Sequence, residues 1–204
     1  MREYESKRLA YVCTGMAQAG AHPHTGEIGG SGAVDARALR SVMRRVPSPV
    51  AVVTAVGRGE ARGMTISSLT RVSLRPPLVS FNVEREAQMH AVLAEASSFA
   101  VHLVGEEQAA LCERFAAPDR TGADQLRGLA QGIDGFGNPV LEGALAVLHC
   151  RLYAAYPAGD HSILVGEVVG VWQQEGGTPL VYFDRAYHGV GARVLDRRAP
   201  VPDG

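Results

Sequence analysis

Short apolar runs rich in β-branched residues, separated by brief turns, constrain the fold of this chain more than any other feature. Runs of this length and composition are typical of buried strands, and Gly or Pro marks the turns between them. A helix does not follow each strand in regular alternation, which excludes a doubly wound parallel sheet. The sequence therefore predicts a mainly β fold, a closed antiparallel barrel of six or seven strands. The apolar runs lie at residues 50–56, 78–83, 99–104, 144–156, 161–173 and 179–183, and residues 61–68 and 69–74 are expected to be extended segments.

A few short helices are expected beside the strands. Apolar residues at helical spacing predict them at residues 35–45, 89–96 and 106–116. The polar, Gly-rich segment from residue 117 to residue 143 carries no clear period, and no element is predicted there.

The first residues differ in composition from the rest of the chain. Gly, Ala, Ser and Thr dominate them, and they end in G-E-I-G-G-S-G-A, which is typical of a flexible linker. We therefore expect a flexible N-terminal extension at residues 1–34, one domain at residues 35–194 and a C-terminal tail at residues 195–204.

Charge and composition exclude several classes of function. The formal net charge of −1 gives no attraction to nucleic acid or to an anionic membrane, and no apolar run indicates a membrane span or a signal peptide, so a cytoplasmic protein is expected. Lys7 is the only lysine, which excludes a Walker-type phosphate loop. Without a C-x-x-C pair, Cys112 and Cys150 are expected to be small apolar fillers. His22 and His24 alone are too few ligands, and no metal site is predicted.

The segment G-M-T-I-S-S, residues 63–68, places three hydroxyl groups and no charge between two expected strands. One explanation is the solvent face of a strand, where Ser and Thr are common. The other is a neutral ledge of hydroxyl and backbone N–H groups that holds a phosphate and the polar edge of a flat ring without any lysine. A flavin has this combination of groups. The segment by itself leaves both explanations open.

Four motifs in a fixed order make the chain similar to a known family. They are P-S-P-V-A-V-V-T-A at residues 47–55, G-M-T-I-S-S, V-S-L-R-P-P-L-V at residues 72–79 and G-D-H at residues 159–161. With the sequence around them, residues 37–192 resemble the flavin reductases that serve two-component flavin-dependent monooxygenases. The resemblance implies an FMN-binding split β-barrel, usually a homodimer. It further implies reduction of FMN or FAD by NADH or NADPH, and release of reduced flavin to a partner monooxygenase.

The family pattern also implies which residues contact the flavin. The G-M-T-I-S-S segment would run along the ring, with its two serines near the ribityl chain and the phosphate. Arg85 would balance phosphate charge, and Phe115 would pack beside the ring. Residues 86–89, E-A-Q-M, lack the hydroxyls that many members carry there, so Gln88 and backbone N–H groups would replace them. The full set implied is Ser48, Pro49, Val50, Met64, Thr65, Ile66, Ser67, Ser68, Phe81, Asn82, Val83, Arg85, Gln88 and Phe115.

The G-D-H motif opens a long strand and is implied to form the nicotinamide side of the site. His161 would be the catalytic contact of the dinucleotide, and Asp160 would set its loop. Tyr187 and His188 are further candidates for the pyridine nucleotide. Hydride transfer needs no side-chain acid or base, which would explain an uncharged site.

Two other functions fit a flavin-binding split barrel. An oxidase of the pyridoxamine-phosphate type usually relies on arginine and lysine at its phosphate site, and this chain has lysine only at position 7. A flavin sensor without a nicotinamide site would have no need of the G-D-H motif. The choices between FAD and FMN and between NADH and NADPH stay open.

Overall fold

The computed structural model describes residues 34–117 and 120–192. Most of the expected N-terminal extension (residues 1–34), all of the C-terminal tail (residues 195–204) and the histidines at positions 22 and 24 lie outside these ranges. Within the described residues, no helix is long and apolar enough to cross a membrane.

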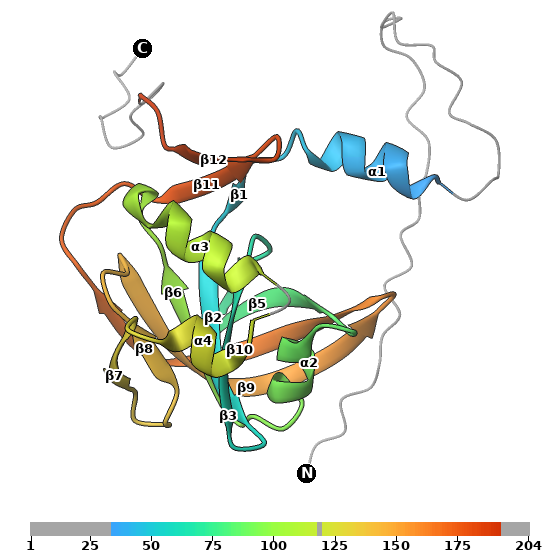
Figure 1. Cartoon of the computed structure of the whole chain (residues 1–204). Coiled ribbons are helices and arrows are strands. Elements are labelled where there is room, and N and C mark those ends of the chain that lie inside the picture. Colours follow the sequence, from blue (N-terminus) through green and yellow to red (C-terminus); the bar gives the residue numbers. More distant parts are fainter. Residues whose placement is uncertain (1–33, 118–119, 193–204) are drawn as a thin grey trace, which may run out of the picture. The chain divides into compact units, whose positions relative to one another are not determined.

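A single antiparallel sheet of seven strands dominates the fold (Figure 1). Its order is β3-β2-β6-β9-β10-β5-β4, and all of its neighbouring strands are antiparallel. The mainly β, antiparallel fold predicted from the sequence is confirmed. The strands are β2 (Ala51–Gly57), β3 (Glu60–Ile66), β4 (Thr70–Leu74), β5 (Pro77–Glu84), β6 (Ser98–Leu103), β9 (Ala146–Ala158) and β10 (His161–Gln173).

The sheet does not close on itself, so the expectation of a closed barrel is wrong in that respect. Strands β3 and β4 are its two edges, and no ladder joins them in the part of the chain that the structure describes. Helices α3 (Ala109–Ala116) and α4 (Gly122–Leu126) pack against β3 instead (Figure 1). Covering an edge with helices satisfies or shields its unpaired backbone groups, as a closing strand would do.

Smaller elements complete the described fold. A three-stranded sheet contains β1 (Ser48–Pro49), β11 (Leu180–Phe183) and β12 (Ala186–Gly189). A hairpin joins β7 (Ala130–Ile133) to β8 (Pro139–Leu141). The remaining helices are α1 (Ala36–Met43), α2 (Gln88–Leu93) and the 3-10 turn η1 (Glu106–Gln108). The three predicted helices are therefore present, but the β7–β8 hairpin, α4 and β12 were not predicted.

The core has two main clusters on opposite faces of β2. Ala51 and Val53 pack in a cluster centred on Phe81 and Phe99, whose rings meet edge to face with centroids 5.2 Å apart. Val52 faces the other way, into a cluster that includes Phe115. Both faces of β2 are buried, which explains why this strand reads as a continuous β-branched run rather than an alternating one.

The two described cysteines are structural, as the sequence predicted. Both are free and buried. Burial raises the pKa of Cys112 to about 11 and that of Cys150 to about 12. Their thiols therefore stay protonated at neutral pH, which is the unreactive form.

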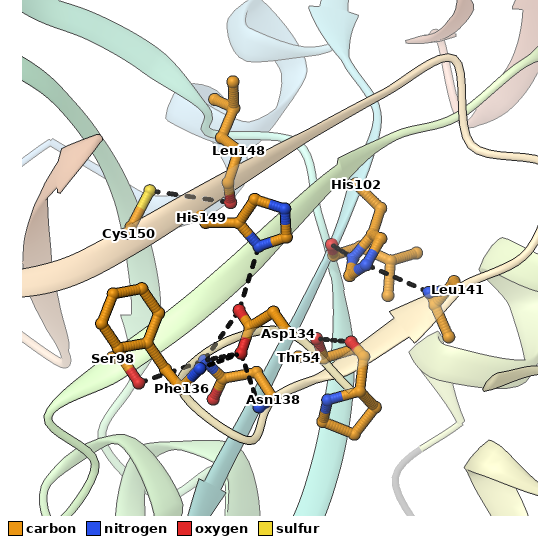
Figure 2. A network of polar contacts seen from close by, with 12 residues as sticks. Thr54, Ser98, His102, Asp134, Phe136, Asn138, Leu141, Leu148, His149 and Cys150 are labelled. Carbon is orange, nitrogen blue, oxygen red and sulfur yellow. Dashed lines mark hydrogen bonds and ion pairs between the residues drawn. The ribbon is translucent and has the colours of Figure 1, made fainter. Parts of the chain in front are cut away.

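A buried polar network joins β6 and β9 to the β7–β8 hairpin (Figure 2). Fully buried His102 bonds to the carbonyl of Val52 through Nδ1 and accepts the N–H of Leu141 at Nε2. Burial lowers the pKa of His102 to about 4, so its ring is neutral at pH 7. Nearby, burial acts to raise the pKa of Asp134, but hydrogen bonds from His149, Asn138 and the Phe136 N–H outweigh it and lower that pKa.

Candidate functional site

A cavity of about 660 Å³ opens at the β3 edge of the main sheet. This volume is in the range of small-molecule and cofactor sites. Residues from β3, β5, α2, α3 and α4 line it, together with the first residue of β10. They are Arg62, Gly63, Met64, Thr65, Ile66, Ser67, Ser68, Asn82, Glu84, Glu86, Ala87, Gln88, Met89, Phe115, Ala116, Ala117, Gln125 and His161.

The free edge of β3 supplies main-chain groups to this cavity. The N–H of Gly63 donates to Gln125 Oε1 at 3.3 Å, so it points away from β2. Gly63 faces Thr54 and Thr65 faces Val52 in a ladder without bulges. Alternate residues of an antiparallel strand turn their N–H and C=O to the same side. The backbone N–H and C=O of Thr65 therefore also point away from β2, on the side of the cavity.

The three hydroxyl groups of the G-M-T-I-S-S segment, those of Thr65, Ser67 and Ser68, differ in their hydrogen bonds and exposure. Thr65 Oγ1 donates to the carbonyl of Cys112 at 2.7 Å, which ties β3 to α3. Ser68 Oγ accepts the N–H of Asn82 at 2.9 Å and keeps its own proton for another partner. Ser67 is exposed at the rim. Only the serine hydroxyls are therefore left to meet a ligand.

Gly63 allows Phe115 to form a wall of the cavity. A Cβ atom at position 63 would lie 2.5 and 2.6 Å from two carbons of the Phe115 ring. Phe115 is 2% exposed and belongs to the second core cluster. The phenyl ring can approach β3 this closely only because this position has no side chain.

The charged residues at the cavity are few and partly compensated. Arg62 is almost buried; it donates to Glu60 Oε1 at 2.9 Å and to the carbonyl of Arg120 at 3.1 Å. Glu84 and Glu86 also line the cavity. Arg85 does not; its side chain lines two neighbouring pockets, one of them beside Asp160. The predicted phosphate role of Arg85 has no support from this placement.

The G-D-H motif brings His161, the first residue of β10, to the cavity. Gly159 has φ +64° and makes the turn between β9 and β10. Asp160 Oδ1 lies 2.7 Å from His161 Nδ1, and this hydrogen bond lowers the pKa of the exposed Asp160 carboxyl. The histidine side chain is 43% exposed, so it is accessible to a ligand. Its ring is oriented by Asp160 rather than packed in the core.

A smaller pocket of about 220 Å³ adjoins the main cavity. It shares Thr65, Ile66 and Ser67 with the main cavity and adds Val50 and Tyr187. Burial raises the pKa of Tyr187, with Glu113 adding to the effect, so its phenol is protonated at neutral pH.

Several residues implied by the family pattern lie away from the cavity. Ser48 and Pro49 pair with β11, and the side chains of Phe81 and Val83 are buried in the first core cluster. The sequence analysis missed Gln125, Arg62 and Glu84. Gln125 lies in the segment for which no element was predicted, and only its approach to the β3 edge makes it part of the site.

Comparison with known proteins places this architecture in a family. The sequence model of the flavin reductase like domain matches residues 43–191. The chain is 43% identical over 150 residues to the reductase component of 4-hydroxyphenylacetate 3-monooxygenase from Thermus thermophilus, covering 74% of this chain and 93% of the relative. It is 42% identical over 156 residues to actinorhodin polyketide dimerase from Streptomyces coelicolor, covering 76% and 86%.

A solved structure gives the same result. An NADH:FAD oxidoreductase from Streptomyces globisporus, in complex with NAD and FAD fragments, superposes with a TM-score of 0.72 at 34% identity and covers 81% of this chain and all of that one. Together, the matched family model, the extent of these alignments and the β3-edge cavity show that the chain belongs to the flavin reductase like domain family.

Proposed function

We propose that this protein is an NAD(P)H:flavin oxidoreductase that reduces FMN or FAD by hydride transfer and releases the reduced flavin. The observation that carries the proposal is the main-chain edge of β3 at Thr65, which is turned away from β2 toward a cavity of about 660 Å³ that His161 also lines. Family membership supports it, as does the relative described as an NADH:FAD oxidoreductase. We further infer that residues 35–194 form the catalytic domain.

The residues present suit a flavin. The main-chain N–H and C=O groups of β3 match the alternating donors and acceptors along the polar edge of an isoalloxazine, and Phe115 offers an apolar wall for its body. Ser67, Ser68 and Gln88 are left for the ribityl chain and the phosphate. When bound, the flavin supplies the redox chemistry, and the chain positions it.

His161 is assigned to the nicotinamide. Hydride transfer requires the two rings to approach to about 3–3.5 Å. His161 lines the cavity from the start of β10, and Asp160 accepts a hydrogen bond from Nδ1 and leaves Nε2 for the dinucleotide. This arrangement separates the flavin contacts on β3 from the nucleotide contact on β10.

We expect His161→Ala to raise the KM for NADH by about tenfold, because one hydrogen bond to the dinucleotide is worth about 1 kcal/mol or somewhat more. The flavin dissociation constant should change by less than about twofold, since the β3 edge is untouched. Steady-state kinetics and flavin titration measure the two quantities. An equal loss in both would contradict the assignment, and Asp160→Asn, which keeps the imidazole, should give a smaller effect on KM.

One assay separates the proposed function from its rivals. Purified protein is mixed with FMN or FAD and with NADH or NADPH, and the nicotinamide absorbance band is followed. A reductase consumes the nucleotide in step with flavin, whereas a sensor or an oxidase of the pyridoxamine-phosphate type does not. The four combinations also decide which flavin and which nucleotide this chain prefers.

We propose that the reduced flavin goes to a flavin-dependent monooxygenase in the cytoplasm. The relative from Thermus thermophilus is itself described as the reductase component of a monooxygenase. A dissociable flavin fits this site, because the buried arginine at the cavity, Arg62, is already paired with Glu60 and does not have to be uncovered when the flavin leaves.

We also propose that the protein is a homodimer. Helix α1 aligns Leu39, Val42 and Met43 at helical spacing, and all three are more than half exposed. Val171 and Trp172 of β10 are likewise exposed. A row of exposed apolar side chains on one face of a helix is the kind of surface that a second subunit covers. Light scattering should give the mass of two chains, and the mass of a single chain at micromolar concentration would contradict the proposal.

A further inference from the structure

The short helix α4 is held against β3 and α3 by several independent contacts. Gly122 approaches the carbonyl of Ala61 so closely that no Cβ would fit between them. Arg62 donates to the carbonyl of Arg120 just before the helix, and Arg114 donates to the carbonyl of Arg127 just after it at 2.9 Å. These contacts fix α4, and therefore its one cavity-lining residue, Gln125, relative to β3.

Gln125 is 2% exposed, and the hydrogen-bond network fixes which way its amide is turned. The N–H of Gly63 is a donor, so the atom that receives it must be the amide oxygen, Oε1. The NH₂ group, Nε2, is thereby turned away from Gly63. Within residues 34–117 and 120–192 it has no hydrogen-bond partner, although the residue lines the cavity.

A second glutamine shows what a purely structural amide does in this fold. Gln108 also accepts the N–H of a glycine, Gly105, at 3.1 Å, but its Nε2 donates to the carbonyl of Glu142 at 3.0 Å. Both ends of that amide are used, and it lies outside the cavity. Gln125 uses only its oxygen. Among the described residues, Gln125 Nε2 is not one of the fully buried polar atoms that lack a partner, so this unused donor is accessible from the cavity that Gln125 lines.

We infer that Gln125 Nε2 is the donor that contacts the electron-rich edge of the bound flavin and stabilises its reduced form. In the reaction the C4–H bond of the dihydronicotinamide breaks, and its electron pair forms the N5–H bond of the flavin. The nucleotide leaves as the oxidised pyridinium, and the reduced flavin carries one negative charge shared by N1 and the C2 carbonyl. An N–H donor aimed at that charge binds the reduced flavin more tightly than the oxidised one. This inference rests on the proposed function.

Gln125 is a neutral donor, which suits a flavin that must depart. A lysine or arginine at this place would bind the reduced anion more strongly and slow its release. The amide gives a preference for the reduced flavin without an ion pair.

The test compares two substitutions at position 125 with a matched control. Gln125→Met keeps the length of the side chain and removes both polar ends, whereas Gln125→Glu, studied at pH 8, keeps the acceptor for Gly63 and removes the donor. Gln108→Met removes an amide of the same kind outside the cavity. Anaerobic titration with oxidised and with reduced FMN and FAD gives the ratio of the two dissociation constants, and dye equilibration gives the potential of the bound flavin.

We expect both Gln125 variants to weaken binding of reduced flavin about tenfold relative to oxidised flavin, and Gln108→Met to leave the ratio unchanged. A tenfold change in this ratio lowers the two-electron potential of the bound flavin by about 30 mV. If Gln125→Met does not fold, Gln125→Glu carries the test alone. An unchanged ratio in the folded variants would overturn this inference only; a wild-type protein that binds neither flavin would overturn the proposed function as well.

Discussion

Replacement of Gly63 by alanine should weaken flavin binding by about tenfold and destabilise the fold by about 1–3 kcal/mol, the usual cost of an overpacked methyl group. The added Cβ would lie 2.5 Å from the Phe115 ring, so the ring has to move. Phe115 cannot move inward, because it is part of a packed core cluster. It therefore moves toward the cavity and narrows the space for the isoalloxazine.

Fluorescence titration with FMN and FAD and urea denaturation measure the two effects. A matched control is Gly132→Ala in β7, where a Cβ would have nothing within 4 Å. The double variant Gly63→Ala/Phe115→Leu should recover much of the lost flavin affinity, because leucine is smaller than phenylalanine and leaves room for the added methyl group at position 63. If Gly63→Ala binds flavin as tightly as the wild type, Phe115 is not a wall of the flavin site.

The second large effect concerns stability and pH. The native pKa of His102 is about 4, below the ordinary 6.5. Between these two pH values the imidazole is protonated in the unfolded chain but neutral in the native protein. The stabilisation is complete above pH 6.5 and is lost as the pH falls from 6.5 toward 4. With one pKa unit worth about 1.4 kcal/mol, the free energy of unfolding should decrease by about 3 kcal/mol over this window.

Urea denaturation at several pH values between 7.5 and 4 tests this expectation. In His102→Gln, whose side chain does not titrate, the decrease in the free energy of unfolding between pH 6.5 and pH 4 should be smaller by about 3 kcal/mol, although the variant is less stable overall. His161→Ala, at an exposed position, should keep the wild-type slope.

Asp134 and His149 are the titratable groups close to His102. The lowered pKa of Asp134 makes its stabilisation disappear only at more acid pH, below its ordinary 3.8. The same slope in wild type and His102→Gln would refute the assignment.

The strands of the main sheet were predictable from the sequence, and most of the small elements outside it were not. The run that became β10, residues 161–173, is predicted with its observed bounds because it is long and apolar, although only its first half, with Leu164 and Val165, packs into the core. Strand β7 is exposed along its whole length and has no apolar pattern to detect. Helix α4 has five residues and is held largely by contacts to β3 and to the arginines beside it. Contacts between segments that are distant in the sequence produce no pattern in the local sequence from which the helix could be predicted.

The candidate site shows the same division. The family motifs identified Met64, Ser68 and His161 as neighbours of one cavity, although they come from different strands or loops. They also suggested Phe81 and Arg85, whose side chains point elsewhere, because a motif fixes a position along a strand but not which face carries the ligand. Gln125 was missed for the opposite reason. It reaches the cavity through tertiary packing alone.

The outward-facing amide of Thr65 has a consequence for how this protein can change. Every amino acid except proline carries a backbone N–H, so replacing the side chain at this position changes the affinity for the flavin ring very little. Alanine scanning would overlook it, and only a backbone ester at this peptide bond would reveal its contribution. The side chains along this part of β3 can therefore change during evolution, and with them the partner protein or the rate of flavin release, while the backbone still recognises the isoalloxazine.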